Sequence, residues 1–151
     1  MSTYYFLPTR NVFGEGSVQE AGVLAKTLNV KKILIVTDAF LAKSGMADKV
    51  AAIYQQVGIG VHIFGGAEPN PTDRNVEEGI KSYRENECNA IVSLGGGSSH
   101  DCAKGIGLIA ANGGSIRDFE GIDKSINNMI PPQAPRLKLR ASVLLPIPNA
   151  R

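Results

Sequence analysis

The sequence has little of what marks secreted, membrane-spanning or nucleic-acid-binding proteins. Its 151 residues include only two cysteines, Cys88 and Cys102, whose spacing forms neither a disulfide framework nor a metal-binding cluster. No apolar run approaches the roughly 20 residues that span a bilayer, and no basic region precedes an apolar one at the N-terminus. The net charge is only +2, from 16 basic and 14 acidic residues, which argues against nucleic acid or a membrane surface as a partner. We therefore expect a cytoplasmic protein of one ordinary-sized domain.

Three short apolar runs carry the strand signal. Residues 33–37 and 90–94 are near-continuous and rich in β-branched side chains, which is typical of strands buried on both faces of a parallel sheet. Residues 61–64 form a weaker third run. Helical patterns fill the intervals, at residues 17–28, 46–57, 72–86 and 98–111.

Cap residues mark the start of two of these helices. Ser17, with Glu20 three positions later, fits a capping box, and Thr72 fits the N-cap of the helix that ends near Asn86. The resulting alternation of strand and helix predicts an α/β fold: a Rossmann-like parallel sheet with helices on both faces and right-handed crossovers.

The most distinctive segment is Gly95-Gly96-Gly97-Ser98, here called the glycine loop, which lies between an expected strand and an expected helix. Consecutive glycines let the backbone turn tightly and approach a ligand with no Cβ in the way. The exposed N–H groups at the start of the following helix favour an anion, typically phosphate, and Ser98 adds a hydroxyl donor. These features favour phosphate binding over a plain glycine-rich turn.

Two further polar residues follow expected strands. Asp38 comes directly after the run at 33–37, where ligands bind in open α/β sheets. Its carboxylate can accept hydrogen bonds from ribose hydroxyls and would repel a 2′-phosphate, which favours NAD over NADP; it fits equally well as the cap of a helix that begins near Phe40. Asn70 lies in the proline-stiffened segment at 68–73, for which a rigid turn into a capped helix is at least as good a reading.

The histidines support no catalytic or metal site by themselves. His100 stands beside Asp101, a pairing that suggests acid–base chemistry, but no nucleophile of suitable context accompanies it. His62 falls within a strand pattern far along the chain from His100, so no histidine-rich metal site is assembled. Lys104, one helical turn beyond His100, is either a solvated helix residue or a group that approaches the ligand.

Three segments taken together make the chain resemble the iron-containing alcohol dehydrogenase family. They are Ile35-Val36-Thr37-Asp38, Glu68-Pro69-Asn70-Pro71-Thr72 and the stretch from Gly95 to Gly105, and their spacing also matches. The similarity covers about residues 4–132 and is greatest to the branch of short-chain alcohol and 1,3-propanediol dehydrogenases. Residues 110–121 continue the match.

The resemblance implies hydride transfer between a short-chain alcohol, or its aldehyde, and the nicotinamide of NAD, at a divalent iron, sometimes zinc, that polarises the alcohol oxygen. It also implies an all-helical second domain that holds the metal, and a homo-oligomer, since family members usually associate. By this resemblance Gly96, Gly97 and Ser98 hold the pyrophosphate, Asp38 binds the adenosine ribose, and Asn70 lies beside the cofactor. The implied cofactor-binding residues are Asp38, Asn70, Gly95, Gly96, Gly97, Ser98, Asp101 and Lys104.

The last residues depart from the family pattern. From Gln133 onward the chain has no acidic residue and lacks the threonine-rich loop that follows the Pro-Pro segment in the family. Permitted codons for residues 134–151, read one frame over, spell a family-like string, so we hypothesise a small deletion with a frameshift near Gln133. We expect residues 1–132 to form a truncated NAD-binding domain, residues 133–151 to be an aberrant, disordered tail, and the metal-binding domain to be missing.

Catalysis by this chain alone is then not expected, and other interpretations stay open. Within enzymes, the runner-up is a relative of glycerol dehydrogenase or dehydroquinate synthase, which share the wider fold. A different class is a stand-alone nucleotide-binding module without catalysis. A third is a non-functional remnant whose uncovered apolar surface and unpaired strand edge would lead to aggregation.

Overall fold

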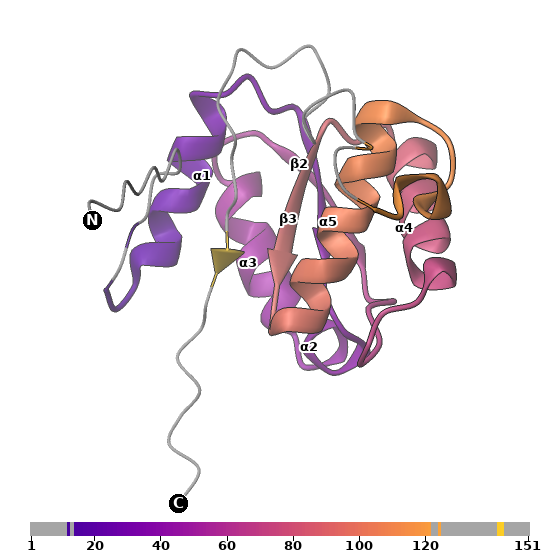
Figure 1. Ribbon diagram of the computed structural model, residues 1–151. Coiled ribbons are helices and arrows are strands. Elements are labelled where there is room, and N and C mark those ends of the chain that lie inside the picture. The colour runs from indigo at the N-terminus through magenta and orange to yellow at the C-terminus, as the bar shows by residue number, and fades with distance from the viewer. Residues whose placement is uncertain (1–11, 13, 122–123, 125–141, 144–151) are drawn as a thin grey trace, which may run out of the picture.

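A parallel β-sheet lies between two layers of helices in the computed structural model, which describes residues 12, 14–121, 124 and 142–143 (Figure 1). The strands are β1 (Lys32–Val36), β2 (Gly60–Phe64), β3 (Ala90–Leu94) and β4 (Ser142–Val143). They are hydrogen-bonded in the order β2-β1-β3-β4, and every pairing is parallel. The predicted parallel α/β fold is confirmed.

The strand order sets the place where a ligand would bind. From β1 the chain moves outward to β2 and then returns across β1 to β3. The direction of winding therefore reverses between β1 and β3. In open α/β sheets the loops that leave such a switch point diverge, and the crevice between them at the carboxyl ends of the strands is where ligands bind.

Helices cover both faces of the sheet, as predicted (Figure 1). On one face lie α1 (Glu20–Lys26), preceded by the 3-10 turn η1 (Ser17–Gln19), and α3 (Met46–Gln55), which follows the short α2 (Ala39–Lys43). On the other face lie α4 (Asp73–Glu85) and α5 (Gly97–Asn112), followed by the 3-10 turn η2 (Ile116–Phe119). None of the helices in the described part of the chain is long and apolar enough to cross a membrane.

Alternation along β1 builds the two halves of the core. Ile33 and Ile35 are buried against α1 and α3, whereas Leu34 and Val36 are buried against α4 and α5. Because successive side chains of a strand point to opposite faces, a continuous apolar run is what a strand covered on both sides requires. The central position of β1 explains the near-continuous apolar run at 33–37.

The two predicted helix caps have different outcomes. Thr72 is the N-cap of α4, and Oδ1 of Asn75 accepts a hydrogen bond from the Thr72 backbone N–H at 2.9 Å, which confirms the cap. The predicted Ser17 cap is wrong. Ser17 is already the first residue of η1, following Gly16 in the left-handed region at φ 74°, and α1 begins only at Glu20 without a side-chain cap. A capping side chain needs an extended backbone outside the helix, which Ser17 does not have.

Of the predicted tail, residues 133–151, the structure describes only residues 142–143. Ser142 and Val143 pair with Ser93 and Leu94 to form β4. The rest of residues 133–151 lies outside the described residues, so the frameshift and disorder of this segment stay predictions.

Candidate functional site

The carboxyl ends of β1, β2 and β3 bring three candidate segments to one edge of the sheet. Val36 pairs with Phe64 on one side and with Ser93 on the other. Asp38 and Gly95, each two residues further along, therefore leave the sheet at the same level, on either side of the switch point. An alanine Cβ at Gly95 would lie only 3.1 Å from Cδ1 of Leu41 in α2, so the glycine loop adjoins the helix that Asp38 begins.

The helix start behind the glycine loop has unpaired donors. The first backbone bond of α5 runs from the N–H of His100 to the carbonyl of Gly96, and the N-cap Gly96 offers no side-chain cap. The N–H groups of residues 97–99 consequently have no acceptor among the described residues, as expected of the first turn of a helix. With the helix dipole, these groups form a site suited to an anion.

The three glycines of the loop are there for different physical reasons. Gly95 has φ 128°, and a Cβ there would lie 2.8 Å from Oγ of Ser99, so the fold itself requires glycine. At Gly96 and Gly97 neither condition holds: the backbone is outside the left-handed region, and an added Cβ would meet nothing within 4 Å. The fold leaves open space in front of the unpaired N–H groups, which is what close approach by a phosphate needs.

Asp38 is a helix cap, one of the two roles that the sequence left open, and this role does not prevent it from binding a ribose. It is the N-cap of α2, and its Oδ1 accepts a hydrogen bond from the backbone N–H of Leu41 at 2.9 Å. The side chain is partly exposed, and its second carboxylate oxygen has no partner in the described part of the chain. That oxygen remains available to accept a hydrogen bond at the edge of the sheet.

Asn70 stands out by its backbone. It has φ 54°, in the left-handed region, and its side chain is exposed between Pro69 and Pro71. Asparagine tolerates this conformation better than most residues, and prolines on both sides stiffen the loop. The backbone that presents this polar side chain is thus restricted in the loop that leads from β2 to α4.

Asp101 and Lys104 lie close together, but they line a cleft that is separate from the glycine loop. Nζ of Lys104 lies 2.9 Å from Oδ1 of Asp101, and both side chains are exposed on α5. They line a cleft of about 320 Å³ between α4 and α5 that does not include the glycine loop. The other lining residues are Pro71, Thr72, Asp73, Val76, Gly105, Leu108 and Ile116.

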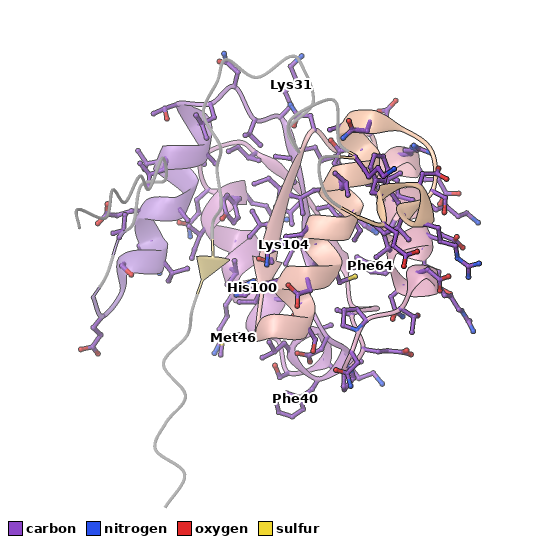
Figure 2. All side chains as sticks on the ribbon, in the orientation of Figure 1. Lys31, Phe40, Met46, Phe64, His100 and Lys104 are labelled. Atoms are coloured by element: carbon purple, nitrogen blue, oxygen red, sulfur yellow. The ribbon has the colours of Figure 1, made fainter. Side chains whose placement is uncertain are left out.

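His100 has a contact that the sequence did not reveal. Its side chain extends from α5 (Figure 2), with Nδ1 2.6 Å from Oγ of Ser93 in β3, while its Nε2 is buried without a partner among the described residues. Burial, and secondly the nearby Lys104 ammonium, lower the pKa of His100, so the imidazole is neutral at pH 7. The available signal was the strand alternation, which puts Ser93 on the face of the sheet that α5 covers.

Among the described residues, the Cys102 thiol is not activated as a nucleophile and no metal centre is found. Burial raises the pKa of the Cys102 thiol to about 11, so it is protonated at neutral pH. No group of three or more histidine, cysteine, aspartate or glutamate side chains is placed to hold a metal ion anywhere in the described ranges. An iron or zinc ion implied by the family therefore does not fit these residues.

A parallel sheet with helices on both faces and a helix start suited to an anion at its switch point is the arrangement of nucleotide-binding α/β domains. The model of one such family, iron-containing alcohol dehydrogenase, matches residues 8–139, and the chain belongs to this family. The match extends past residue 132, where the resemblance was expected to end.

Individual relatives agree with this assignment. The chain is 46% identical over 129 residues to an NAD-dependent methanol dehydrogenase from Bacillus methanolicus, covering 85% of this chain and 34% of that protein. It is 46% identical over 127 residues to alcohol dehydrogenase 4 from Schizosaccharomyces pombe, covering 84% of this chain and 30% of that one. A crystal structure of 1,3-propanediol oxidoreductase superposes with a TM-score of 0.79 at 41% identity, over 87% of this chain and 34% of that one. The chain thus spans about a third of the length of the relatives it matches.

Proposed function

We propose that this chain binds NAD at the carboxyl edge of its sheet, as the cofactor-binding part of an NAD-dependent dehydrogenase of short-chain alcohols. The observation that supports this most is the combination of open space at Gly96 and Gly97 with three unpaired N–H groups behind them. If the glycine loop served only as a turn in the fold, glycine would be required at Gly95 but not at Gly96 or Gly97. Family membership supplies the class of reaction, and the names of the methanol and 1,3-propanediol relatives support small alcohols as substrates.

In this proposal the pyrophosphate of NAD lies on the first turn of α5, where Ser98 adds its hydroxyl to the backbone donors. The free oxygen of Asp38 accepts a hydrogen bond from the adenosine ribose, and Asn70 contributes its amide beside the cofactor. Asp101 and Lys104 border the adjoining cleft, and the proposal includes their ion pair in the site because both residues follow the glycine loop on α5. Bound NAD would supply the hydride acceptor; the described residues provide its binding and no metal-dependent step.

The cofactor preference follows from the charge at Asp38. A carboxylate beside the ribose repels a 2′-phosphate, so NAD should be preferred to NADP. Asp38→Asn tests this cleanly, because asparagine is as good an N-cap as aspartate and should preserve α2. We expect the variant to unfold like the wild type while its preference for NAD over NADP falls roughly tenfold, a change of about 1.4 kcal/mol in relative binding free energy.

The experiment is calorimetric titration of the 151-residue chain with NAD and with NADP, for the wild type and Asp38→Asn. Saturable NAD binding with reduced discrimination in the variant supports the proposal. A folded wild-type chain that binds neither nucleotide contradicts it. With methanol or 1,3-propanediol this chain alone should form no NADH, because its described residues hold no metal centre; NADH formation, followed by absorbance, would contradict that expectation.

A further inference from the structure

A side-chain hydrogen bond joins the two ends of the segment that carries the glycine loop. Oγ of Ser93, near the end of β3, and Nδ1 of His100, at the beginning of α5, lie 2.6 Å apart. The six residues 94–99 between them include all three consecutive glycines and all three unpaired N–H groups. We call this contact the serine–histidine bridge.

The register of the sheet explains how the bridge forms. Ser93 pairs with Val36, which packs against α4 and α5, whereas the flanking Val92 and Leu94 pack on the opposite face. Ser93 therefore points toward α5. Side chains of a helix tilt toward its N-terminus, so the imidazole of His100 leans back over the first turn and meets the hydroxyl there. The bridge fastens the start of α5 to the end of β3.

The bridge does not depend on one tautomer of the imidazole. A serine hydroxyl both donates and accepts, so it can pair with Nδ1 whether or not that nitrogen carries the proton. The nearby charged groups, Lys104 and Asp101, act on His100 in opposite directions, and both lie on α5. Because Nε2 has no partner among the described residues, Ser93 is the polar contact that orients the ring.

Three successive glycines make such a bridge useful. Glycine loses more conformational freedom on ordering than any other residue, so an unrestrained loop would have to be ordered by the ligand at the cost of affinity. A contact that already holds both ends of the loop reduces that cost, because the donors are preorganised before the ligand arrives.

On the basis of the proposed NAD binding, we propose that Ser93 and His100 are positioning residues for the cofactor: their hydrogen bond holds the first turn of α5 so that its unpaired N–H groups face the pyrophosphate. Neither side chain needs to touch the cofactor. Breaking the bridge should therefore loosen the loop in the free protein and weaken NAD binding together.

The test compares Ser93→Ala with Ser93→Thr, which keeps the hydroxyl, in the 151-residue chain. His100→Phe removes the bridge from the other side while keeping ring volume, and Ser82→Ala on α4 is the matched control, since its hydroxyl bonds to no described residue. Amide hydrogen exchange of residues 95–99 in the free chain and calorimetric NAD affinity are measured for each. A net hydrogen bond corresponds to roughly three- to tenfold in affinity.

We expect Ser93→Ala and His100→Phe to exchange faster in the loop and to bind NAD three- to tenfold more weakly. The double variant should be no weaker than either single one, because both remove the same bond. Ser93→Thr should restore most of the affinity, and Ser82→Ala should match the wild type in both measurements.

Different results overturn different claims. A wild-type chain that binds no NAD removes the proposed function, and with it the positioning role. If the wild type binds and Ser93→Ala changes exchange but not affinity, the bridge is only structural. Unchanged exchange, additive losses in the double variant, or a Ser93→Thr chain as weak as Ser93→Ala would each overturn the bridge while leaving NAD binding intact.

Discussion

Replacing Gly97 by alanine tests whether glycine is needed at this position for ligand binding and not for the fold. Gly97 is the first residue of α5, its backbone is outside the left-handed region, and a Cβ there meets nothing within 4 Å. Alanine should therefore leave the free energy of unfolding unchanged or raise it by up to about 1 kcal/mol, since it restricts the unfolded chain and favours the helix. The same Cβ occupies the space that a phosphate would approach, so NAD affinity should fall at least about tenfold, or 1.4 kcal/mol.

Gly22 provides the opposite control. A Cβ at Gly22 in α1 would lie 2.6 Å from the backbone oxygen of Ile53 in α3, which cannot move aside as a flexible side chain could. Gly22→Ala should lower the free energy of unfolding by about 1–3 kcal/mol, as overpacking does, while the chains that remain folded keep wild-type NAD affinity.

Urea denaturation and calorimetric titration of both variants check the pair of predictions. We expect the two variants to have opposite effects. Gly97→Ala should keep the stability and lose NAD affinity, whereas Gly22→Ala should lose stability and keep NAD affinity. If Gly97→Ala binds NAD as tightly as the wild type, the loop is a plain glycine-rich turn and the reasoning about open space is wrong.

The remaining predictions concern Asn70 and Asp73. Asn70→Gly should change the free energy of unfolding by less than about 1 kcal/mol, because relief of the left-handed backbone offsets the greater freedom of the unfolded chain, whereas NAD affinity should fall several-fold with the lost amide; unchanged affinity would remove Asn70 from the site. The Arg117 guanidinium, through its hydrogen bonds to the carboxylate, holds the pKa of Asp73 below its ordinary value. The ion pair therefore stabilises the fold above the pKa of the unfolded carboxyl, and this contribution is lost as the pH falls through the folded pKa. A carboxyl NMR titration should show the pKa of Asp73 rising toward its ordinary value in Arg117→Gln, and no change there would contradict the pairing.

Local patterns predicted the fold well where burial dictated the sequence. β1 is covered on both faces, so its run of apolar residues indicated a buried strand of a parallel sheet, and Thr72 marked the start of α4 through its cap. Ser17 failed because the left-handed Gly16 tightens the chain into a 3-10 turn, a local backbone choice that composition does not reveal.

The sequence could predict which residues at the strand ends belong to the site, but not how these residues are arranged in space. The sequence could place Asp38 and the glycine loop on the same edge of the sheet, yet only the folded structure distinguishes Gly95, which the fold requires to be glycine, from Gly96 and Gly97. Strand alternation could place Ser93 on the face of the sheet that α5 covers, but its hydrogen bond with His100 also depends on how the glycine loop sets the start of α5, which no periodicity gives. Likewise, the cleft beside Lys104 depends on how α4 packs against α5.

The central claim is that NAD sits on the first turn of α5, and NMR of the ¹⁵N-labelled chain tests it most directly. On titration with NAD, the account predicts that the largest amide shifts occur at residues 96–99, with further shifts beside Asp38 and Asn70. Saturation that leaves residues 96–99 unmoved, or shifts confined to the cleft between α4 and α5, would contradict it.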